Sequence, residues 1–320
     1  MKKFIKTVGA LSVAALVASP AIVSAADYPT RSIEVVVPYS AGGDTDLVTR
    51  SFVESANKYL PQSAGVVNKT GGGGAVGLTE IVMARPNGYK IGTGTVELAM
   101  LPHLGLVSWK ATDVKPIARL NAEPAAITVN AESEWQSFDD FIKYAKENPG
   151  KIRIGNSGSG AIWHIAAESL ADRTSAQFTH IPYNGANPAA TALLGNHIEA
   201  VTVSPAEVVN HVRNGSMRIL AVMADERLAD FPDVPTLKEK GVDLSIATWR
   251  GIVVPKKTPD NVVKVLSDVA YKVSQDSEFT DTLVKMNLTP AYLDAADFSK
   301  VIEKDDKFFN EIMTKLGMAK

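Results

Sequence analysis

The stretch "VVVPYSAGGDTDLVTR", residues Val35 to Arg50, places a run of β-branched residues directly before a glycine pair and a helical pattern. β-Branched residues favour strands, and apolar residues three or four positions apart predict an amphipathic helix over Asp44–Tyr59. Gly42 and Gly43 remove side chains that would block the turn between them. The free amides and partial positive charge of a helix N-terminus attract anions. The stretch therefore predicts a strand, loop and helix that hold an anionic group.

Five further loops have the same composition, rich in Gly, Ser, Thr and Asn and poor in charge. They are "NKTGGGGAVGL", "IGTGTVEL", "IGNSGSGAIWHIAAE", "IPYNGANPAA" and "TVSPAEVV". In open parallel sheets, ligands bind at the carboxyl ends of the strands. We therefore expect loops from two sheets to face each other across a cleft. Ordinary helix caps would explain two or three of these loops, but they explain "GGGG" and "GNSGSG" poorly.

Some side chains near these loops have two interpretations. Asp46 either caps its helix, which is the favoured role, or accepts a hydrogen bond from a ligand. Arg250 either clamps a carboxylate with its guanidinium or forms an ordinary ion pair. Trp163 either contacts the ligand or packs in the core. Ser40 and Thr45 add hydroxyl donors to the first loop.

Catalytic and cofactor motifs are incomplete in this chain. The glycines of the second loop fit G-x-G-x-x-G, but the motif is outside the first strand–helix unit, and no Lys-Ser/Thr completes a phosphate loop. Ser157 resembles an esterase nucleophile, yet position 159 holds serine where G-x-S-x-G requires glycine. The five histidines lack H-x-x-x-H spacing. We therefore expect no enzyme, no metal site and no cofactor.

The rest of the chain alternates short apolar runs with helical patterns, which predicts parallel sheets covered by helices on both faces. The expected strands are Ile33–Val37, Lys90–Gly92, Ile127–Val129, Ile152–Gly155, Thr179–Pro182, Ile198–Val203, Arg218–Met223 and Gly251–Val254. Three successive helices, Pro259–Gln275, Ser277–Met286 and Asp297–Leu316, end the chain. Interdomain crossings are expected near Asn121–Ala126 and Thr248–Gly251, and two crossings make a hinge.

Composition and the N-terminus indicate an exported protein. The chain has 320 residues, which suits two domains, and its net charge of −2 offers no basic surface for nucleic acid. It has no cysteine, which excludes disulfides and a lipid anchor on cysteine. Three lysines, a short apolar run and the small residues Ser24–Ala26 predict a signal peptide over residues 1–26. We therefore expect a soluble periplasmic protein.

Seven segments together resemble the substrate-binding proteins of tripartite tricarboxylate transporters, the TctC or Bug family. They are "YPTRSIEVVVPYSAGGDTDLVTR", "NKTGGGGAVG", "ARPNGYKIGTGT", "GNSGSGAIWHIAAE", "IPYNGANPA", "RILAVMADERLADFPDVPTLKEKG" and "WRGIVVPKKTP". They follow the family's order and cover essentially the whole chain after the predicted signal peptide.

The resemblance implies a two-lobed α/β periplasmic binding protein of type II with a Venus-flytrap hinge. Residues 27–125 plus 249–320 would form lobe 1, and residues 126–248 would form lobe 2. A small carboxylate would be held between the lobes by amides, hydroxyls and water. The implied ligand-binding residues are Tyr39, Ser40, Ala41, Gly42, Gly43, Thr45, Asp46, Thr70, Gly72, Thr93, Thr95, Val96, Ser157, Ser159, Gly160, Ala161, Tyr183, Asn184 and Ser204, with Arg250 added from the charge argument above.

Two departures from the family pattern affect the choice of ligand. Tyr39 replaces the usual phenylalanine, and Ser204 stands where an acidic residue is frequent. The expected function is delivery of a small organic acid, by a monomer, to the large and small permease subunits. A receptor for a two-component system is the alternative, and an exported esterase using Ser157 or Ser159 is a third hypothesis.

Overall fold

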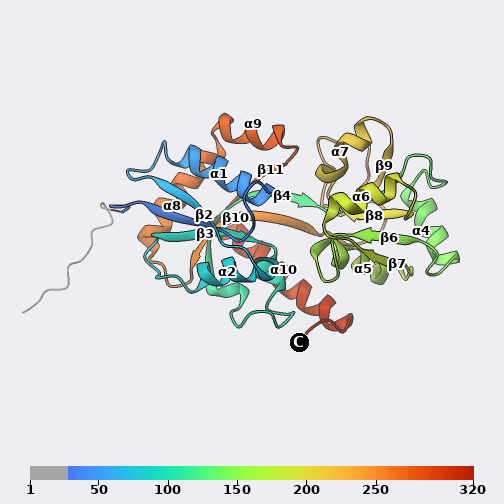
Figure 1. Ribbon diagram of the computed structural model, residues 1–320, viewed down its shortest axis with the longest axis horizontal. Coiled ribbons are helices and arrows are strands. Elements are labelled where there is room, and N and C mark those ends of the chain that lie inside the picture. The colour runs from blue at the N-terminus through green and yellow to red at the C-terminus, as the bar shows by residue number, and fades with distance from the viewer. Residues whose placement is uncertain (1–27) are drawn as a thin grey trace, which may run out of the picture.

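In residues 28–320, which this computed structural model describes, the strands form one sheet of six and one sheet of five. The predicted signal peptide lies outside the described residues. Figure 1 shows the two sheets side by side, each with its own helices. We call the six-stranded sheet with its helices the first lobe and the five-stranded sheet with its helices the second lobe. The predicted two-lobed α/β fold is confirmed.

The strands and helices follow one another along both lobes. The strands are β1 Ile33–Val37, β2 Ala64–Asn68, β3 Lys90–Thr95, β4 Val114–Pro124, β5 Ala126–Asn130, β6 Arg153–Asn156, β7 Thr179–Pro182, β8 Ala200–Val203, β9 Met217–Val222, β10 Ala247–Pro255 and β11 Pro290–Asp294. The helices are α1 Asp44–Ala56, α2 Ala75–Val82, α3 Glu97–Met100, α4 Phe138–Glu147, α5 Ile162–Thr174, α6 Ala186–Leu194, α7 Pro205–Arg213, α8 Asp260–Ser274, α9 Ser277–Lys285 and α10 Ala295–Lys315.

Both sheets are mixed, whereas the sequence pattern predicted parallel sheets. The first sheet has the order β11-β4-β10-β3-β1-β2, and only its β1–β2 and β1–β3 pairs are parallel. The second has the order β7-β6-β8-β5-β9, in which β5 is antiparallel to both β8 and β9. The reason lies in the crossings: the chain leaves the first sheet along β4 and returns along β10, so these paired strands run in opposite directions.

The two crossings lie side by side between the lobes. The first is at Ala125, the single residue between β4 and β5, and its N–H donates to the carbonyl of Ile246 over 2.8 Å. The second precedes Ala247, where β10 begins, and so lies a few residues before the predicted segment. Met223 N–H donates to the carbonyl of Ala125 over 2.7 Å, which ties the end of β9 to the first crossing. This pair of adjacent strands is the predicted double hinge.

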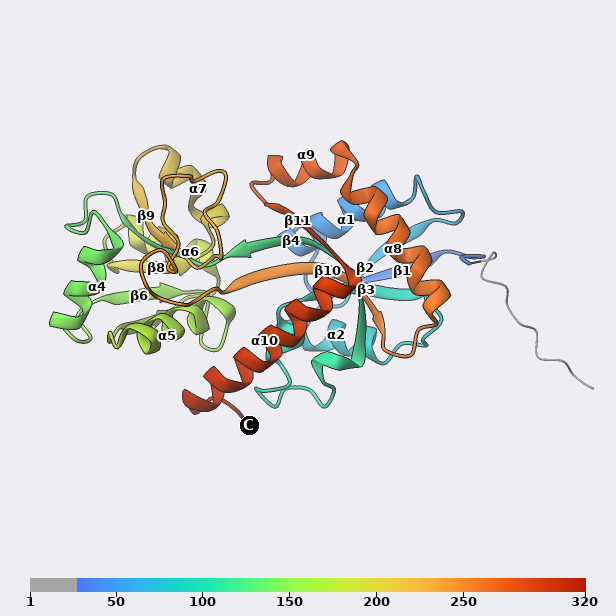
Figure 2. The same cartoon turned by 180° about the vertical axis from the view of Figure 1, so that it is seen from behind.

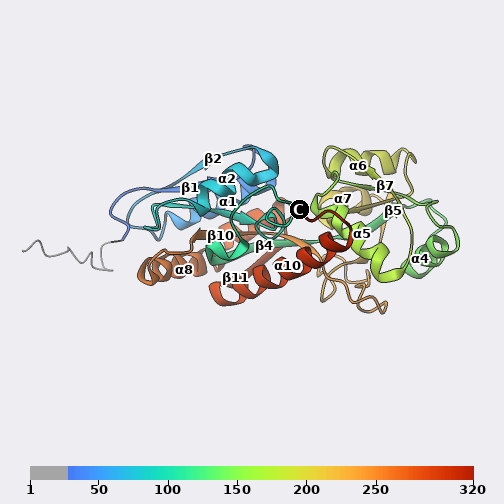
Figure 3. The same cartoon turned by 90° about the horizontal axis from the view of Figure 1, so that it is seen from below.

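Helix α10 connects the two lobes a third time. The ring of Phe298 in α10 packs directly on Gly251 of β10. A Cβ atom added to Gly251 would lie 2.3 Å from that ring. Figures 2 and 3 show α10 running from the first lobe toward α5 of the second. At its far end Lys315 pairs with Asp172 of α5. The helix therefore anchors in one lobe and contacts the other. Within residues 28–320, no helix combines the length and apolar character that a membrane crossing requires.

Candidate functional site

Strand directions bring the predicted loops together. β4 runs toward the crossing and β10 runs away from it. β3 is antiparallel to β10, so β3 ends at the crossing side of the sheet. β1 and β2 run parallel to β3 and end at the same side. In the second lobe β5 runs away from the crossing, and its antiparallel neighbour β8 ends there with β6 and β7. The loops after all six strands therefore lie at the edges of the two sheets that face each other.

Asp46 organises the first loop. Its Oδ2 accepts hydrogen bonds from Gly42 N–H over 2.8 Å and Arg50 Nε over 2.9 Å, and its Oδ1 accepts from Asn68 Nδ2 over 2.8 Å. Asn68 Nδ2 also donates to the carbonyl of Tyr39 over 2.9 Å. Burial alone would raise the pKa of Asp46, but the bonds from Arg50, Gly42 and Asn68 outweigh burial and hold this pKa below its ordinary value. These contacts are those of a residue that positions the loop.

Tyr39 connects the first three loops. Its hydroxyl lies 3.2 Å from Thr95 Oγ1, which donates in turn to Glu97 Oε2 over 2.5 Å, so Tyr39 is the donor to Thr95. Burial, reinforced by Glu97, raises the pKa of Tyr39 well above its ordinary value. Gly74 has φ +99°, and an added Cβ would lie 2.9 Å from the Tyr39 hydroxyl. The glycine run therefore lets the second loop approach the tyrosine closely.

Arg250 lies at the base of the first lobe's loops. Its Nε donates to Thr45 Oγ1 over 3.0 Å, and its Nη2 lies 3.7 Å from Asp44 Oδ2. Its Nη1 is buried and has no hydrogen-bond partner among residues 28–320. Thr93, by contrast, is fully buried, and its hydroxyl lies 2.6 Å from that of Thr49. The guanidinium therefore retains a free donor, whereas the hydroxyl of Thr93 is already used.

A buried carboxyl group, Glu123, lies close to Arg250. Thr289 N–H donates to Glu123 Oε1 over 2.6 Å. Burial raises the pKa of Glu123 to about 7, although the Thr289 bond and the charge of Arg250 oppose the shift. The sequence offered no sign of this group, because Glu123 lies in β4, a strand that the apolar pattern did not reveal.

Ser204 caps helix α7 in the second lobe. Its backbone N–H and its hydroxyl both donate to Glu207 Oε2, over 2.7 and 3.0 Å. Burial raises the pKa of Glu207, the bonds from Ser204 oppose the shift, and the charge of Asp44 on the first lobe adds to it. The hydroxyl of Ser204 is therefore engaged in a capping box, and Glu207 supplies an acidic group from the next turn. The S-x-x-E spacing could have revealed this pair.

The fourth and fifth loops lie against each other. Asn156 Oδ1 accepts from Gly158 N–H, and its carbonyl accepts from Tyr183 N–H, both over 3.1 Å. Gly160 N–H donates to His164 Nδ1 over 3.1 Å. Neither Ser157 nor Ser159 hydrogen-bonds to a histidine or a carboxylate within the described chain, so no charge relay of the esterase type reaches them.

The predicted site residues fall into three groups by exposure. Those exposed on the loops are Ser40, Ala41, Gly42, Gly43, Thr70, Gly72, Ser159 and Asn184. Those half-buried are Tyr39, Ser157, Gly160, Ala161 and Tyr183. Those buried are Thr45, Asp46, Thr93, Thr95, Val96, Ser204 and Arg250. Most of the third group make their polar contacts within the protein. In the first two groups, the amides of Gly42, Gly160 and Tyr183 and the hydroxyl of Tyr39 are also hydrogen-bonded within the protein. Direct contact of each residue with a ligand stays a prediction.

Comparison with known proteins agrees with the two-lobed fold. The chain is 34% identical over 306 residues to the "UPF0065 protein in gbd 5'region" of Cupriavidus necator, covering 95% of this chain and 93% of that protein. It is 43% identical to a TctC solute-binding protein from Polaromonas, with a TM-score of 0.85 and coverage of 90% and 99%. The R. palustris protein Rpa4515, solved with adipate, shares the fold at 24% identity, with a TM-score of 0.76 and coverage of 92% and 99%.

The family itself follows from a match along most of the chain. The family model described as "Tripartite tricarboxylate transporter family receptor" matches residues 48–318, which include most of α1, both crossings and α10. The resemblance drawn from the sequence motifs is thereby confirmed, and the chain belongs to the TctC family of tripartite tricarboxylate transporter receptors.

Proposed function

We propose that this protein captures a small organic acid between its lobes and delivers it to the membrane subunits of a tripartite tricarboxylate-type transporter. The family and the adipate complex of the R. palustris relative support a carboxylate as the ligand. The observation that carries the proposal is that six strand-to-helix loops, three from each lobe, follow strands that end at the facing edges of the two sheets.

The chemistry of these loops suits a carboxylate group. Helix N-termini present amides without partners inside the helix, together with a partial positive charge. The backbone at Gly42 and Gly72 has space around it for a ligand. A Cβ atom added to Gly42 would meet nothing within 4 Å, and one added to Gly72 would meet only Ala75. The free Nη1 of Arg250 adds one charged donor at the base of the cleft. We infer that amides and hydroxyls bind one carboxylate group and that Arg250 faces a second anionic or polar group.

The hinge provides the release mechanism in this proposal. We propose that residues 27–125 with 249–320 form one lobe, that residues 126–248 form the other, and that residues 1–26 are a cleaved signal peptide for export to the periplasm. A ligand shifts a two-state hinge toward closure only if the closed state adds contacts. The loops of the second lobe would add those contacts, and the monomer would present its closed face to the large and small permease subunits.

Thermal unfolding of the refolded, ligand-stripped protein against a panel of organic acids tests this function. A ligand that binds only the folded state stabilises it by about 2.7 kcal/mol at a hundredfold excess over Kd. We expect a rise in the unfolding midpoint with one group of carboxylates. A rise with sugars, amines or nucleotides, and none with any acid, would contradict the proposal.

A further inference from the structure

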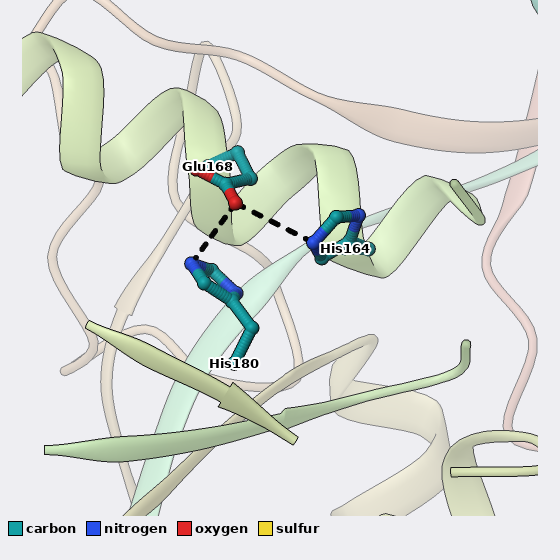
Figure 4. A group of neighbouring side chains, drawn as sticks. All are labelled: His164, Glu168 and His180. Carbon is teal, nitrogen blue, oxygen red and sulfur yellow. Dashed lines mark ion pairs between the residues drawn. The ribbon is translucent and has the colours of Figure 1, made fainter. Parts of the chain in front are cut away.

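Three titratable side chains meet beside the fourth loop, in the second lobe. His164 and Glu168 lie one turn apart on α5, and His180 reaches them from β7 (Figure 4). Glu168 Oε1 lies 3.5 Å from His164 Nε2 and 3.3 Å from His180 Nε2. The two imidazole rings meet edge to face with centroids 5.0 Å apart. The three ligand-type atoms are close enough together to suggest a metal ion.

The proton on His164 argues for a different role. Gly160 N–H donates to His164 Nδ1 over 3.1 Å, so Nδ1 must present its lone pair. A neutral imidazole then carries its single proton on Nε2, the atom that faces Glu168. A metal ion at this place would need the lone pair of Nε2, and the ring would have to lose its last proton or give up the Gly160 bond. The arrangement therefore fits a chain of hydrogen bonds from Gly160 through His164 to Glu168.

We propose that Glu168 and His164 are positioning residues that hold the Ser157–Ala161 loop in its binding conformation through the Gly160 amide. This inference rests on the proposed function in one respect, namely that the Ser157–Ala161 loop contacts the ligand. Glu168 orients the ring and His164 accepts from Gly160, whose φ of +78° is a conformation that glycine adopts readily. His180 supports Glu168 from the other side, because its Nε2 also faces the carboxylate.

This chain of bonds requires the neutral form of His164. A second proton would place an N–H on Nδ1 opposite the N–H of Gly160, so the bond that holds the loop would be lost. The titratable groups around the ring are Glu168 on α5 and His180 on β7, and α10 contributes Lys315, which pairs with Asp172 one turn further along α5. The bond from His164 lowers the pKa of Glu168, and burial lowers that of His180. Glu168 is therefore kept in the charged form that accepts a hydrogen bond from His164 Nε2.

Hydrogen exchange of the ligand-free protein tests the proposal without any ligand. We expect the protection of the amides in residues 157–161 to fall about five- to tenfold in His164→Leu, as for the loss of one hydrogen bond of ordinary strength. His164→Asn, which keeps an acceptor on a shorter side chain, should restore part of that protection. His180→Asn is the matched control, since it leaves His164 and Gly160 in place and should preserve most of it.

The tautomer of His164 distinguishes positioning from simple packing. Imidazole nitrogen NMR of the wild type at high pH should show the proton on Nε2 and the lone pair on Nδ1. A proton found on Nδ1 would overturn the proposal. Stabilisation by Zn²⁺ that His180→Asn abolishes would overturn it too, in favour of a metal site. None of these outcomes depends on whether the protein binds a carboxylate.

Discussion

Replacement of Gly43 by valine should abolish ligand binding and leave the fold intact. Gly43 precedes α1 with φ −81° and ψ 164°, an extended conformation that any residue adopts. An added Cβ would meet only the carbonyl oxygen of Ser40, at 3.7 Å. Valine is less favourable than glycine at an N-cap, so we expect a loss of no more than about 1 kcal/mol in the free energy of unfolding. For a protein of this size that corresponds to a midpoint lower by roughly 1–2 °C.

Binding should suffer far more, because the valine methyl groups would stand in front of the amides at the start of α1. A hydrogen bond to a charged group contributes about 1.5–3 kcal/mol, so the loss of one such bond alone weakens affinity roughly 10- to 100-fold. Calorimetric titration with the acid selected by the thermal panel measures this loss. Gly65→Val is the matched control, since an added Cβ at Gly65, in strand β2, meets nothing within 4 Å. Retained affinity in Gly43→Val would refute the assignment of the first loop to the ligand.

Three other substitutions test the base of the cleft. Arg250→Ala should weaken binding roughly 10- to 100-fold if the free Nη1 contacts the ligand, and unchanged affinity in titration would leave Arg250 with a structural role only. The folded wild type holds the proton of Glu123 more tightly than the unfolded state does, so its free energy of unfolding should fall as the pH rises from about 4.5 to about 7. Glu123→Gln should remove this fall. Identical profiles of stability against pH for the two proteins in urea titrations would contradict this. Asp46→Asn should lower the free energy of unfolding by about 1–3 kcal/mol near neutral pH. The difference from wild type should shrink as the pH falls through the lowered pKa of Asp46. A difference that persists in urea titrations at acid pH would show that the charge of Asp46 is not responsible.

The parts of the fold that the sequence predicted are those with strong local patterns. β1 was predicted with the bounds that the structure shows, because four β-branched residues, Ile33 and Val35 to Val37, precede a proline and two glycines. β4 was missed because its sequence, "VKPIARLNAEP", contains two prolines and several charged residues. β4 is held in the sheet by its neighbours β10 and β11, which lie far from it in the sequence. A local sequence pattern does not reveal pairing between such distant strands.

The candidate site divides in the same way. The glycine-rich loops were found because their composition is unusual, and strand direction then places them at the facing edges of the two sheets. The acidic groups at Glu123 and Glu207 were missed, since a carboxyl group acquires a raised pKa only from its burial in the folded protein. The cluster of His164, Glu168 and His180 was missed for a related reason: a search for H-x-x-x-H spacing overlooks a glutamate one turn away and a histidine on another element.

In the proposed function, the loops between the lobes recognise the negative charge of a carboxylate through backbone amides and Arg250. Calorimetric titration of the ligand-stripped protein with the best acid of the panel, and with its neutral amide analogue, tests this most directly. The two ligands have nearly the same shape, but only the acid carries the charge that helix N-termini attract. We predict binding of the acid and at least a hundredfold weaker binding of the amide, or about 2.7 kcal/mol. Equal affinity for both would contradict the account, because the loops would then recognise shape or neutral polar groups instead of charge.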